Sequence, residues 1–517
     1  MRTFTFILAL TISVSAFAQQ GIAWQKTFGG SGHEYIQKTI PTSDGGFAFV
    51  GSSESTDGDV SGNHGQNDIW VAKATAAGAI QWSYLFGGTQ DEEGFDLVQT
   101  ADGGFFVCGW TDSFDGDVTG HHGTYSSDMW VLRLSASGTL MNSKCYGGTS
   151  DDEGIAITLT QDDNLYVAGT TYSYDGDVSG NHGTYQSDCW VIKMDTSLNL
   201  LAQKCIGGSD YEEGIDMKLT SDNGVVICGR SYSADGDATG YHAGSDMLVA
   251  KLTAAFSIEW AKCFGGSETE EGNSVVQLAD NSYAVLGYTS TQNNGDVTGH
   301  HSPQGQDDFW LVKLNTNGTL NWAKCYGGSG DDQANGLVAT LDGGYAMCGL
   351  TNSTDGDVTG FHSALFNPDF WVAKVNGSGT LQWQGCYGGN DQDESFRIYE
   401  ESAGVFVVTG FTYSTDYDVT LNHGSADGWI IKVTGSNGID DIGAAQFLVW
   451  PNPAFDYIYF DPDNLVSVNL FDVTGRNISI QKSVLSGKIS VKDVPVGMYF
   501  LELVSENGRT VKPFVKN

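Results

Sequence analysis

A tripeptide of the form aromatic-Gly-Gly recurs through most of the chain and constrains its fold more than any other feature. It begins at Phe28, Phe86, Tyr146, Phe264, Tyr326 and Tyr387, and Ile206 once replaces the aromatic residue. Successive copies are separated by 58, 60, 60, 58, 62 and 61 residues. A period of this length predicts a repeat architecture, in which each unit buries its apolar face against its neighbours.

Each unit contains four short runs rich in Val, Phe, Trp and Tyr, bounded by turn residues. In the second unit, the turn Asp102-Gly103-Gly104 precedes the run 105–109. A loop of the form Asp-Gly-Asp-Val-x-Gly-x-His then leads to a run that begins at Asp128. Such runs predict antiparallel strands. Four strands repeated seven times predict an all-β fold, a seven-bladed β-propeller of four-stranded blades over residues 19–435. An open β-solenoid is the alternative.

The two ends of the repeat region complete each other. The chain after residue 18 begins with a fourth-type strand at 23–28, whereas the last unit ends with its third-type strand at 428–433. We therefore expect the N-terminal strand to complete the last blade. This closure removes two exposed sheet edges, which would otherwise invite aggregation.

The first 18 residues have the pattern of a secretory signal peptide. Arg2 precedes an apolar run, and Ala16-Phe17-Ala18 has the small-x-small spacing of a cleavage site. The run is shorter than the roughly 20 apolar residues that a membrane-spanning helix needs. No later segment is long and apolar enough to span a membrane. The sequence therefore predicts export without a membrane span.

Charge divides the chain into two regions. The chain has 63 acidic and 24 basic residues, a net charge of −39. Residues 447–517 contain seven of each sign, so the acidic excess lies in residues 19–446. This change predicts a linker at 436–446 and a separate C-terminal domain at 447–517. The acidic surface makes nucleic acids and anionic membranes poor partners.

The C-terminal region has alternating apolar runs broken by turns, which predicts a small β-sandwich. Its motif residues are Pro451, Asn452, Pro453, Asp472, Gly475, Arg476, Gly497, Tyr499, Lys512 and Lys516. In order and spacing these residues resemble the C-terminal sorting domain of the type IX secretion system of Bacteroidetes. That resemblance implies passage through the periplasm, with the secretion translocon and its processing peptidase as partners. It also implies release from the cell or attachment to the outer-membrane surface.

The propeller repeats resemble those of bacterial surface and exported proteins, with Trp24-Gln25-Lys26-Thr27-Phe28-Gly29-Gly30 as one opening and an Asp-Gly-Gly-Phe turn. This resemblance covers residues 21–435. It implies the fold and says little about function, because propellers carry enzymes, lectins and scaffolds alike.

The loop before each third strand carries alternating aspartates. These candidate metal ligands are Asp57, Asp59, Asp115, Asp117, Asp175, Asp177, Asp235, Asp237, Asp355 and Asp357. Each loop also has a histidine, namely His64, His122, His182, His242, His301, His362 and His423. The spacing resembles the oxygen ligands that Ca²⁺ favours. The alternative is a set of Asx turns in which the carboxylates bind loop amides.

One carboxylate follows each Gly-Gly pair by four residues. These seven, which we call the crossover carboxylates, are Glu34, Glu92, Asp152, Glu212, Glu270, Asp332 and Asp393. Propeller topology places them and the Asp-rich loops on one side, which predicts an acidic face that takes cations, or a glycan or protein ligand. Capping of backbone amides is the alternative.

No hydrolase motif is present: the chain has no Gly-x-Ser-x-Gly, His-Glu-x-x-His, Cys-x-x-Cys or phosphate loop. Abundant carboxylate pairs keep a glycosidase or lyase open. Aromatic residues flank the Asp-rich loops and suggest glycan stacking, at Phe114, Tyr172, Tyr174, Tyr232 and Tyr413. We predict an exported, non-catalytic binding or adhesion propeller, with an extracellular glycan-active enzyme as the alternative.

Nine cysteines are present. Equivalent positions in neighbouring blades are too far apart for a disulfide, so most cysteines are predicted to be small buried apolar residues. A hairpin in which Met194 pairs with Leu200 puts Cys189 opposite Cys205, and we predict one disulfide there.

Overall fold

A computed structural model describes residues 21–160, 162–303, 305–363, 367–435, 449–450, 456–460, 465–472, 476–478, 488–492, 494–505 and 508–516. The predicted signal peptide (1–18) and linker (436–446) lie outside the described residues. The chain divides into two compact units, Met1–Gly435 and Ser436–Asn517, and each is described here by itself. Within the described residues, no helix is long and apolar enough to cross a membrane.

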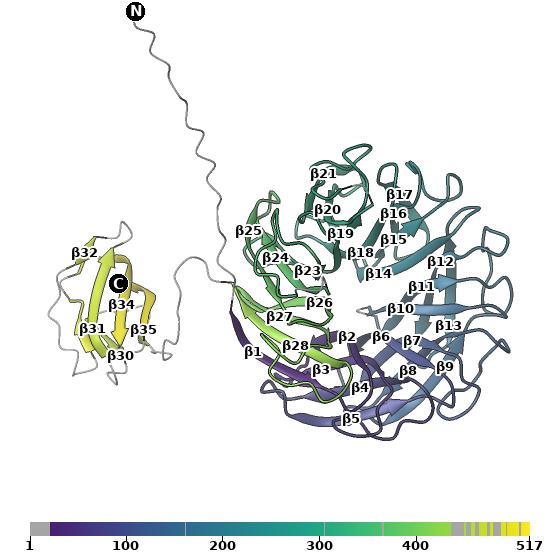
Figure 1. Ribbon diagram of the computed structural model, residues 1–517, viewed down its shortest axis with the longest axis horizontal. Coiled ribbons are helices and arrows are strands. Elements are labelled where there is room, and N and C mark those ends of the chain that lie inside the picture. Colours follow the sequence, from purple (N-terminus) through teal and green to yellow (C-terminus); the bar gives the residue numbers. More distant parts are fainter. Residues whose placement is uncertain are drawn as a thin grey trace, which may run out of the picture. The chain divides into compact units, whose positions relative to one another are not determined.

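The described residues of the first unit form seven antiparallel sheets of four strands each and no helix (Figure 1). Blade 1 is β2 (Glu34–Pro41), β3 (Phe47–Ser53), β4 (Asp68–Ala74) and β5 (Ile80–Phe86). Blade 2 is β6 (Glu92–Gln99), β7 (Phe105–Thr111), β8 (Asp128–Leu134) and β9 (Leu140–Tyr146). Blade 3 is β10 (Asp152–Leu159), β11 (Asn164–Thr171), β12 (Asp188–Asp195) and β13 (Leu200–Ile206). Blade 4 is β14 (Glu212–Leu219), β15 (Val225–Ser231), β16 (Asp246–Leu252) and β17 (Ile258–Phe264).

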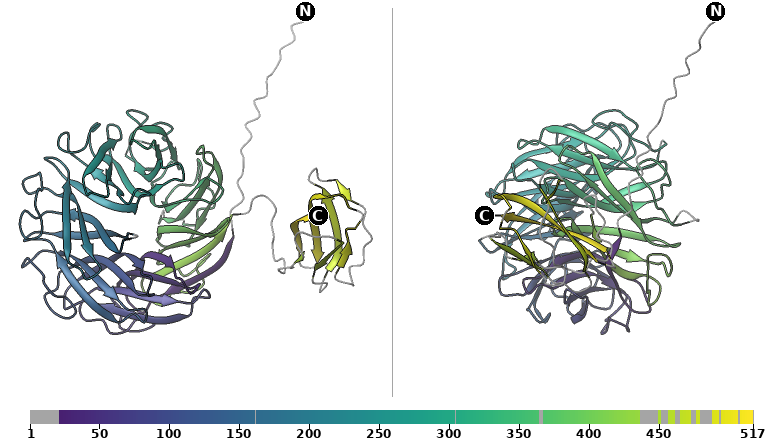
Figure 2. Two further views of the ribbon diagram at one scale, coloured as in Figure 1. Left: turned by 180° about the vertical axis from the view of Figure 1, so that it is seen from behind. Right: turned by 90° about the vertical axis from the view of Figure 1, so that its left-hand side faces the viewer.

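The remaining blades repeat this order. Blade 5 is β18 (Glu270–Gln277), β19 (Tyr283–Thr289), β20 (Asp308–Leu314) and β21 (Leu320–Tyr326). Blade 6 is β22 (Asp332–Ala339), β23 (Tyr345–Thr351), β24 (Asp369–Val375) and β25 (Leu381–Tyr387). Blade 7 is β26 (Asp393–Ser402), β27 (Val405–Thr412), β28 (Asp427–Thr434) and the N-terminal β1 (Ile22–Phe28). The predicted seven-bladed β-propeller is confirmed, and the view from behind in Figure 2 shows the same ring.

The N-terminal strand closes the ring, as predicted. β1 pairs antiparallel with β28, with Lys26 opposite Ile430 and Phe28 opposite Gly428. A side-chain contact supports the ladder, because the Trp429 indole donates to the Gln25 amide oxygen (3.1 Å). The last blade therefore joins strands that are about 400 residues apart in the chain.

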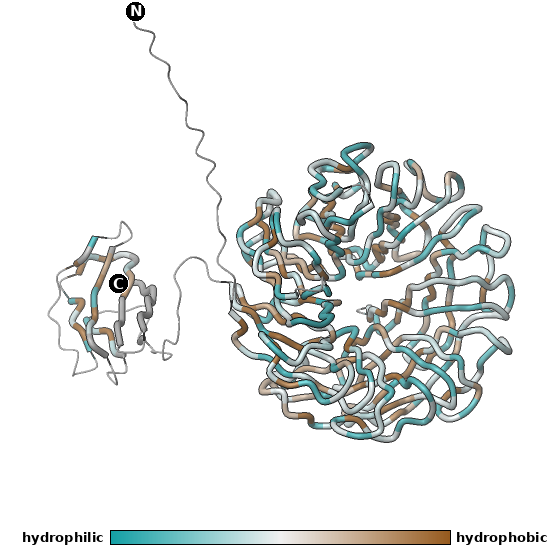
Figure 3. The backbone as a smooth tube through the Cα atoms, in the orientation of Figure 1, coloured by the Kyte–Doolittle hydropathy of each residue, from teal (hydrophilic) through white to brown (hydrophobic). Residues whose placement is uncertain are grey.

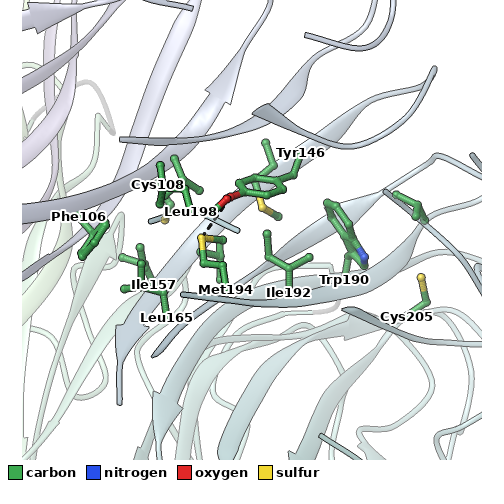
Figure 4. Close-up of a cluster of buried hydrophobic side chains, with 14 residues drawn as sticks. Phe106, Cys108, Tyr146, Ile157, Leu165, Trp190, Ile192, Met194, Leu198 and Cys205 are labelled. Atoms are coloured by element: carbon green, nitrogen blue, oxygen red, sulfur yellow. Dashed lines mark hydrogen bonds between the residues drawn. The ribbon is translucent and has the colours of Figure 1, made fainter. Parts of the chain in front are cut away.

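The apolar core lies between adjacent blades. Figure 3 places the hydrophobic residues along the strands and most hydrophilic residues in the loops. In the cluster of Figure 4, Phe106 and Tyr146 of blade 2 pack with Trp190 and Met194 of blade 3. The Tyr146 hydroxyl donates to the Leu198 carbonyl (2.6 Å), so even the polar end of this ring is satisfied. Each blade thus buries its face only against its neighbours, which explains why one residue pattern repeats seven times.

The predicted Cys189–Cys205 disulfide is wrong. All nine cysteines lie in described strands, all are buried, and none forms a disulfide. Met194 does pair with Leu200, but a bulge after that pair shifts the register by one residue. Cys189 therefore pairs with Ile206, and Cys205 pairs with Trp190. The one-residue shift sends the two thiols to opposite faces of the sheet, where they belong to different core clusters.

The second unit contains two antiparallel sheets. One is β29 (Val449–Trp450), β30 (Tyr457–Phe460) and β33 (Lys488–Ser490). The other is β32 (Asn477–Ile478), β31 (Leu465–Asp472), β34 (Gly497–Ser505) and β35 (Gly508–Lys516). Residues of both sheets share one buried cluster, in which Ile458 and Ile489 of the first sheet meet Val468, Leu470 and Leu501 of the second.

Candidate functional site

The crossover carboxylates lie inside the propeller rather than on its surface. All seven are 0% exposed. In blade 1, one Glu34 oxygen accepts from the Gly30 N–H (2.7 Å) and the other from the Ser53 hydroxyl (2.7 Å). The glycine-to-carboxylate bond recurs in all seven units at 2.7–2.9 Å. A Cβ on Gly29 would lie 2.5 Å from a Glu34 oxygen, which explains why Gly-Gly precedes each carboxylate.

The first aspartate of each Asp-rich loop binds the same crossover. Asp57 accepts from the Ser31 N–H (2.7 Å), and Asp115 accepts from the Thr89 N–H (2.9 Å). The equivalent bonds of Asp175, Asp235 and Asp355 measure 2.7–2.8 Å. The second aspartate binds the crossover through its backbone N–H. In blade 1, the Asp59 N–H donates to the Gly29 carbonyl (2.9 Å). The alternating aspartates thus fasten each loop to the crossover that precedes it.

The loop histidines lie between carboxylates of two blades. Each histidine Nδ1 lies 2.6–2.9 Å from the aspartate that opens its own third strand. At four interfaces its Nε2 also faces the second loop aspartate of the next blade, as in the 3.8 Å contact from His122 to Asp177. Among the described residues, no three His, Cys, Asp or Glu side chains are grouped to hold a metal ion. Calcium binding by these loops stays a prediction.

A second set of acids, which the sequence analysis missed, lies on the innermost strands. Each follows a crossover carboxylate directly. This set, the glutamate ring, comprises Glu93, Glu153, Glu213, Glu271 and Glu394. Two successive acids at the start of five units were the signal that could have found them. In the other two units, Tyr35 and Gln333 take this position.

Hydrogen bonds between blades order most of the glutamate ring. The Gln37 amide donates to Glu93 (3.0 Å), and the Asn335 amide donates to Glu394 (3.3 Å). Arg230 binds two members, Glu213 (2.9 Å) and Glu271 (3.0 Å). Burial raises the pKa of Glu153 to about 7, and the nearby charge of Glu213 adds to the effect.

A network of opposite charges lies farther along the same strands. It comprises Lys38, Asp96, Asp216, Lys218 and Arg397, from blades 1, 2, 4 and 7. Lys38 pairs with Asp96, and Lys218 pairs with Asp216. Burial opposes ionisation of Asp216, but Lys218, Arg397 and Lys38 together lower its pKa to about 2. Cations of three blades act on one carboxylate, so this charged network links blades that are not neighbours.

We expect Asp216→Asn to destabilise the propeller by about 2 kcal/mol. One Asp216 oxygen accepts from the Val275 N–H (3.0 Å) and the Ser274 hydroxyl (3.1 Å) of the next blade. The substitution leaves Lys218 without its buried anion, which costs about 1–3 kcal/mol, moderated because Lys218 is more than a third exposed. The urea midpoint measures the loss. Glu401→Gln, which breaks only the peripheral pair with Lys432, is the control and should shift the midpoint little. Equal shifts of the urea midpoint in the two variants would contradict the stabilising role of Asp216 in the charged network.

The stability of the propeller should fall as the pH rises from about 5 to about 8. Burial raises the pKa of four crossover carboxylates to about 7, namely Glu92, Asp152, Asp332 and Asp393. Carboxyl groups of the unfolded chain have pKa values of about 4. Between the unfolded and folded pKa values, the folded state therefore binds more protons than the unfolded state. The free energy of unfolding consequently falls as the pH rises through this range. The hydrogen bond to Asp308 raises the pKa of His301, and its contribution is also lost with rising pH. Urea midpoints at pH 5 and pH 8 test this, with Asp152→Asn expected to flatten the dependence. A higher midpoint at pH 8 would contradict it.

The aromatic residues predicted beside the loops fall into two groups. Phe114 and Tyr174 are exposed. Tyr172 packs near Tyr211 with ring centroids 6.4 Å apart, and the Tyr413 hydroxyl lies 2.9 Å from that of Tyr35. The Arg230 guanidinium lies 5.9 Å from the Tyr232 ring. The second group therefore packs near the glutamate ring, while the first faces solvent.

The predicted sorting residues lie in the second unit. Pro451, Asn452, Pro453 and Gly475 lie outside the described residues. Asp472 ends β31, Gly497 begins β34, Lys512 and Lys516 belong to β35, and Arg476 precedes β32. Tyr499 is buried, and its hydroxyl donates to the Pro495 carbonyl (2.9 Å).

Comparison with known proteins finds similar chains of low sequence identity. Across 398 residues, the chain is 23% identical to the regulatory protein FlaEY of Caulobacter vibrioides, covering 69% of this chain and 40% of FlaEY. The chain therefore spans well under half the length of this relative. Hydrazine synthase of Kuenenia stuttgartiensis has a TM-score of 0.45 at 11% identity, covering 75% of this chain and 95% of that one. The Pan2 WD40 domain of Neurospora crassa has a TM-score of 0.43 at 9% identity, covering 78% and 90%.

The C-terminal region matches a defined protein family. Residues 448–517 match the secretion system C-terminal sorting domain. The match includes the sorting motif residues that the sequence analysis singled out, from Pro451 to Lys516. This protein is therefore a seven-bladed β-propeller that carries a secretion system C-terminal sorting domain.

Proposed function

We propose that this protein is an exported binding module, which the type IX secretion route delivers to the cell surface or the extracellular space. The observation that carries the proposal is the sorting domain at 448–517 behind a propeller. The sorting domain directs secretion, and the propeller provides a large rigid scaffold for exposed loops. FlaEY is named a regulatory protein, but that description adds no ligand for this chain.

Three features favour binding over catalysis. The carboxylates repeated in every unit bind backbone N–H groups, so their recurrence serves the architecture. Among the described residues that line it, a cleft of about 480 Å³ between blades 5 and 6 has one carboxylate, Asp357, and a second cleft of about 320 Å³ likewise has one, Asp280. Glycoside hydrolysis ordinarily needs two facing carboxyl groups. Four of the five members of the glutamate ring bind a neighbouring Gln, Asn or Arg.

A glycan array probed with the full chain tests the proposal, combined with an assay for newly formed sugar ends. We expect retention on at least one class of glycan without product release. Release of sugar fragments from a polysaccharide panel would overturn the non-catalytic assignment.

The second candidate is a glycan-active enzyme at the glutamate ring. Burial and the nearby charge of Glu213 raise the pKa of Glu153 to about 7, and a carboxyl group with a raised pKa suits a general acid. If this candidate holds, Glu153→Gln abolishes product release while binding persists. Glu401→Gln, at the propeller periphery, is the matched control and should release product normally.

A further inference from the structure

Blades 2 and 3 differ from the other blades in the loop between their second and third strands. The loop histidine and the aspartate of the third strand are six positions apart in these two blades, against four in blades 1, 4 and 7 and seven in blades 5 and 6, whose longer loops have a different sequence. The additional residues bring the same tripeptide, Gly-Thr-Tyr, at 123–125 and at 183–185. Two neighbouring blades thus share a feature that the ring architecture does not require.

The inserted tyrosines are almost completely solvent-exposed. Tyr125 is 101% exposed and Tyr185 is 85% exposed. A second aromatic residue accompanies each of them just before the Asp-Gly-Asp sequence, with Phe114 48% and Tyr174 46% exposed. Other units have Thr56, Ala234, Asn293, Thr354 and Thr415 at that position. We call Phe114, Tyr125, Tyr174 and Tyr185 the aromatic platform, four large exposed side chains on equivalent loops of two adjacent blades.

The loop of blade 3 holds its tyrosine in a strained conformation. Tyr185 has a φ of +70°, a region that a residue with a bulky side chain rarely adopts. The Tyr185 N–H donates to the Tyr174 hydroxyl (2.6 Å), which in turn donates to the Gln186 carbonyl (3.2 Å). Tyr174 is therefore a positioning residue for Tyr185. Strain that surrounding contacts maintain is typical of ligand-binding loops.

An exposed aspartate directly follows Phe114 and Tyr174 in the chain. Asp115 follows Phe114 and Asp175 follows Tyr174, and each accepts from a threonine of the crossover while remaining exposed to solvent. The loop of each of these two blades therefore carries both exposed aromatic rings and an exposed hydrogen-bond acceptor. This combination suits a sugar ring, whose C–H face packs on an aromatic ring while its hydroxyls donate to oxygen acceptors.

The duplication of the platform points to a ligand that is itself repetitive. Tyr125 and Tyr185 are 60 residues apart, which is one repeat, and they occupy equivalent positions in adjacent blades. A cation cage requires aromatic faces that converge within about 6 Å of one point. Among the described residues, no ring contact joins any two members of the platform, whereas Phe114 packs on His121 (4.2 Å). The net charge of −39 disfavours an anionic polymer.

From these observations we infer that the aromatic platform binds a neutral polysaccharide, with adjacent sugar units on blades 2 and 3. The inference rests on the proposed binding function and names its ligand class. Tyr125 and Tyr185 supply the stacking surfaces, and Asp115 and Asp175 accept hydrogen bonds from sugar hydroxyls.

Affinity electrophoresis of the full chain tests this inference in gels that contain laminarin, yeast mannan or arabinoxylan, with poly-lysine as a cationic probe. We expect retardation by at least one neutral polymer. Tyr125→Ala/Tyr185→Ala should weaken that binding by about thirtyfold, as loss of an aromatic anchor does. Tyr125→Phe/Tyr185→Phe keeps the rings and should retain most of the affinity. Tyr417→Ala, at an exposed tyrosine on the corresponding loop of blade 7, is the matched control and should bind normally.

The outcomes separate this inference from the proposed function. Binding of a neutral polymer that survives Tyr125→Ala/Tyr185→Ala would overturn the platform and leave the binding function intact. Retardation by poly-lysine alone, lost in the double variant, would assign the platform to a cationic partner and overturn the carbohydrate assignment. If the wild-type chain binds none of the neutral polymers, the inference fails, and the glycan array then decides the proposed function independently.

Discussion

Deletion of residues 19–30 is expected to abolish the cooperative unfolding of the propeller and to cause aggregation. The deletion removes β1, so β28 loses its partner along the whole pairing from Ile22 to Phe28. An unpaired strand edge is a template for association with other chains. Phe28, which is fully buried and packs on Phe49 with ring centroids 5.2 Å apart, is lost as well. Size-exclusion chromatography and thermal unfolding measure the effect.

Addition of the missing strand as a peptide provides the control for this deletion. A synthetic peptide of residues 19–30 should restore part of the unfolding transition, because the ladder to β28 needs no covalent connection. The single substitution Gln25→Ala, which removes the hydrogen bond from Trp429 and the bond to the Asp418 carbonyl, should cost only about 2 kcal/mol. A melting curve of the deletion variant that matches wild type would refute ring closure by β1.

Deletion of residues 447–517 is expected to abolish delivery of the propeller beyond the outer membrane of its host. Residues 448–517 match a secretion system C-terminal sorting domain. The truncated chain therefore keeps its predicted signal peptide but loses the sorting domain. The propeller should then accumulate in the periplasm. Fractionation of cells, followed by detection of the propeller in periplasm, envelope and medium, measures its distribution.

Two controls distinguish lost sorting from lost folding. The periplasmic fragment should give the same thermal transition as the propeller of the full chain, because each of the two units is compact by itself. Glu401→Gln in the full chain, a peripheral change in the propeller, should reach the cell surface normally. Normal surface delivery of the truncated chain would refute the sorting role.

Much of the fold could be predicted because the same pattern of strand and turn residues occurs seven times in the sequence. One unit such as 86–145 gives four strands and their turns, and the count of strand types gives the closure by residues 23–28. The burial of the cysteines followed from their place in these strands. The disulfide prediction failed because the register between β12 and β13 depends on a bulge next to Met194. The side-chain pattern of this hairpin does not predict that bulge.

The candidate site was less predictable, because its members come together only in space. The repeated carboxylates are the more conspicuous feature of the sequence, yet they are buried, and the partly exposed acids are the residues that follow them, such as Glu153 after Asp152. The pairing of Lys38 with Asp96 joins neighbouring blades, and the effect of Lys38 on Asp216 crosses the ring. Exposed Tyr125 and Tyr185 were visible in the sequence as a duplicated Gly-Thr-Tyr, but nothing in that tripeptide gives its exposure.

By itself the sequence determined the all-β repeat, the number of blades, the closing strand and the sorting domain, because each depends on local periodicity or on a contiguous motif. The tertiary structure decided which carboxylates are buried, which face of a strand each cysteine occupies and which charges meet across the innermost strands. These properties depend on register and on contacts between residues roughly 60 to 400 positions apart. The local sequence pattern therefore determines the strands and turns of each blade. Packing between blades determines the burial and the contacts of each side chain.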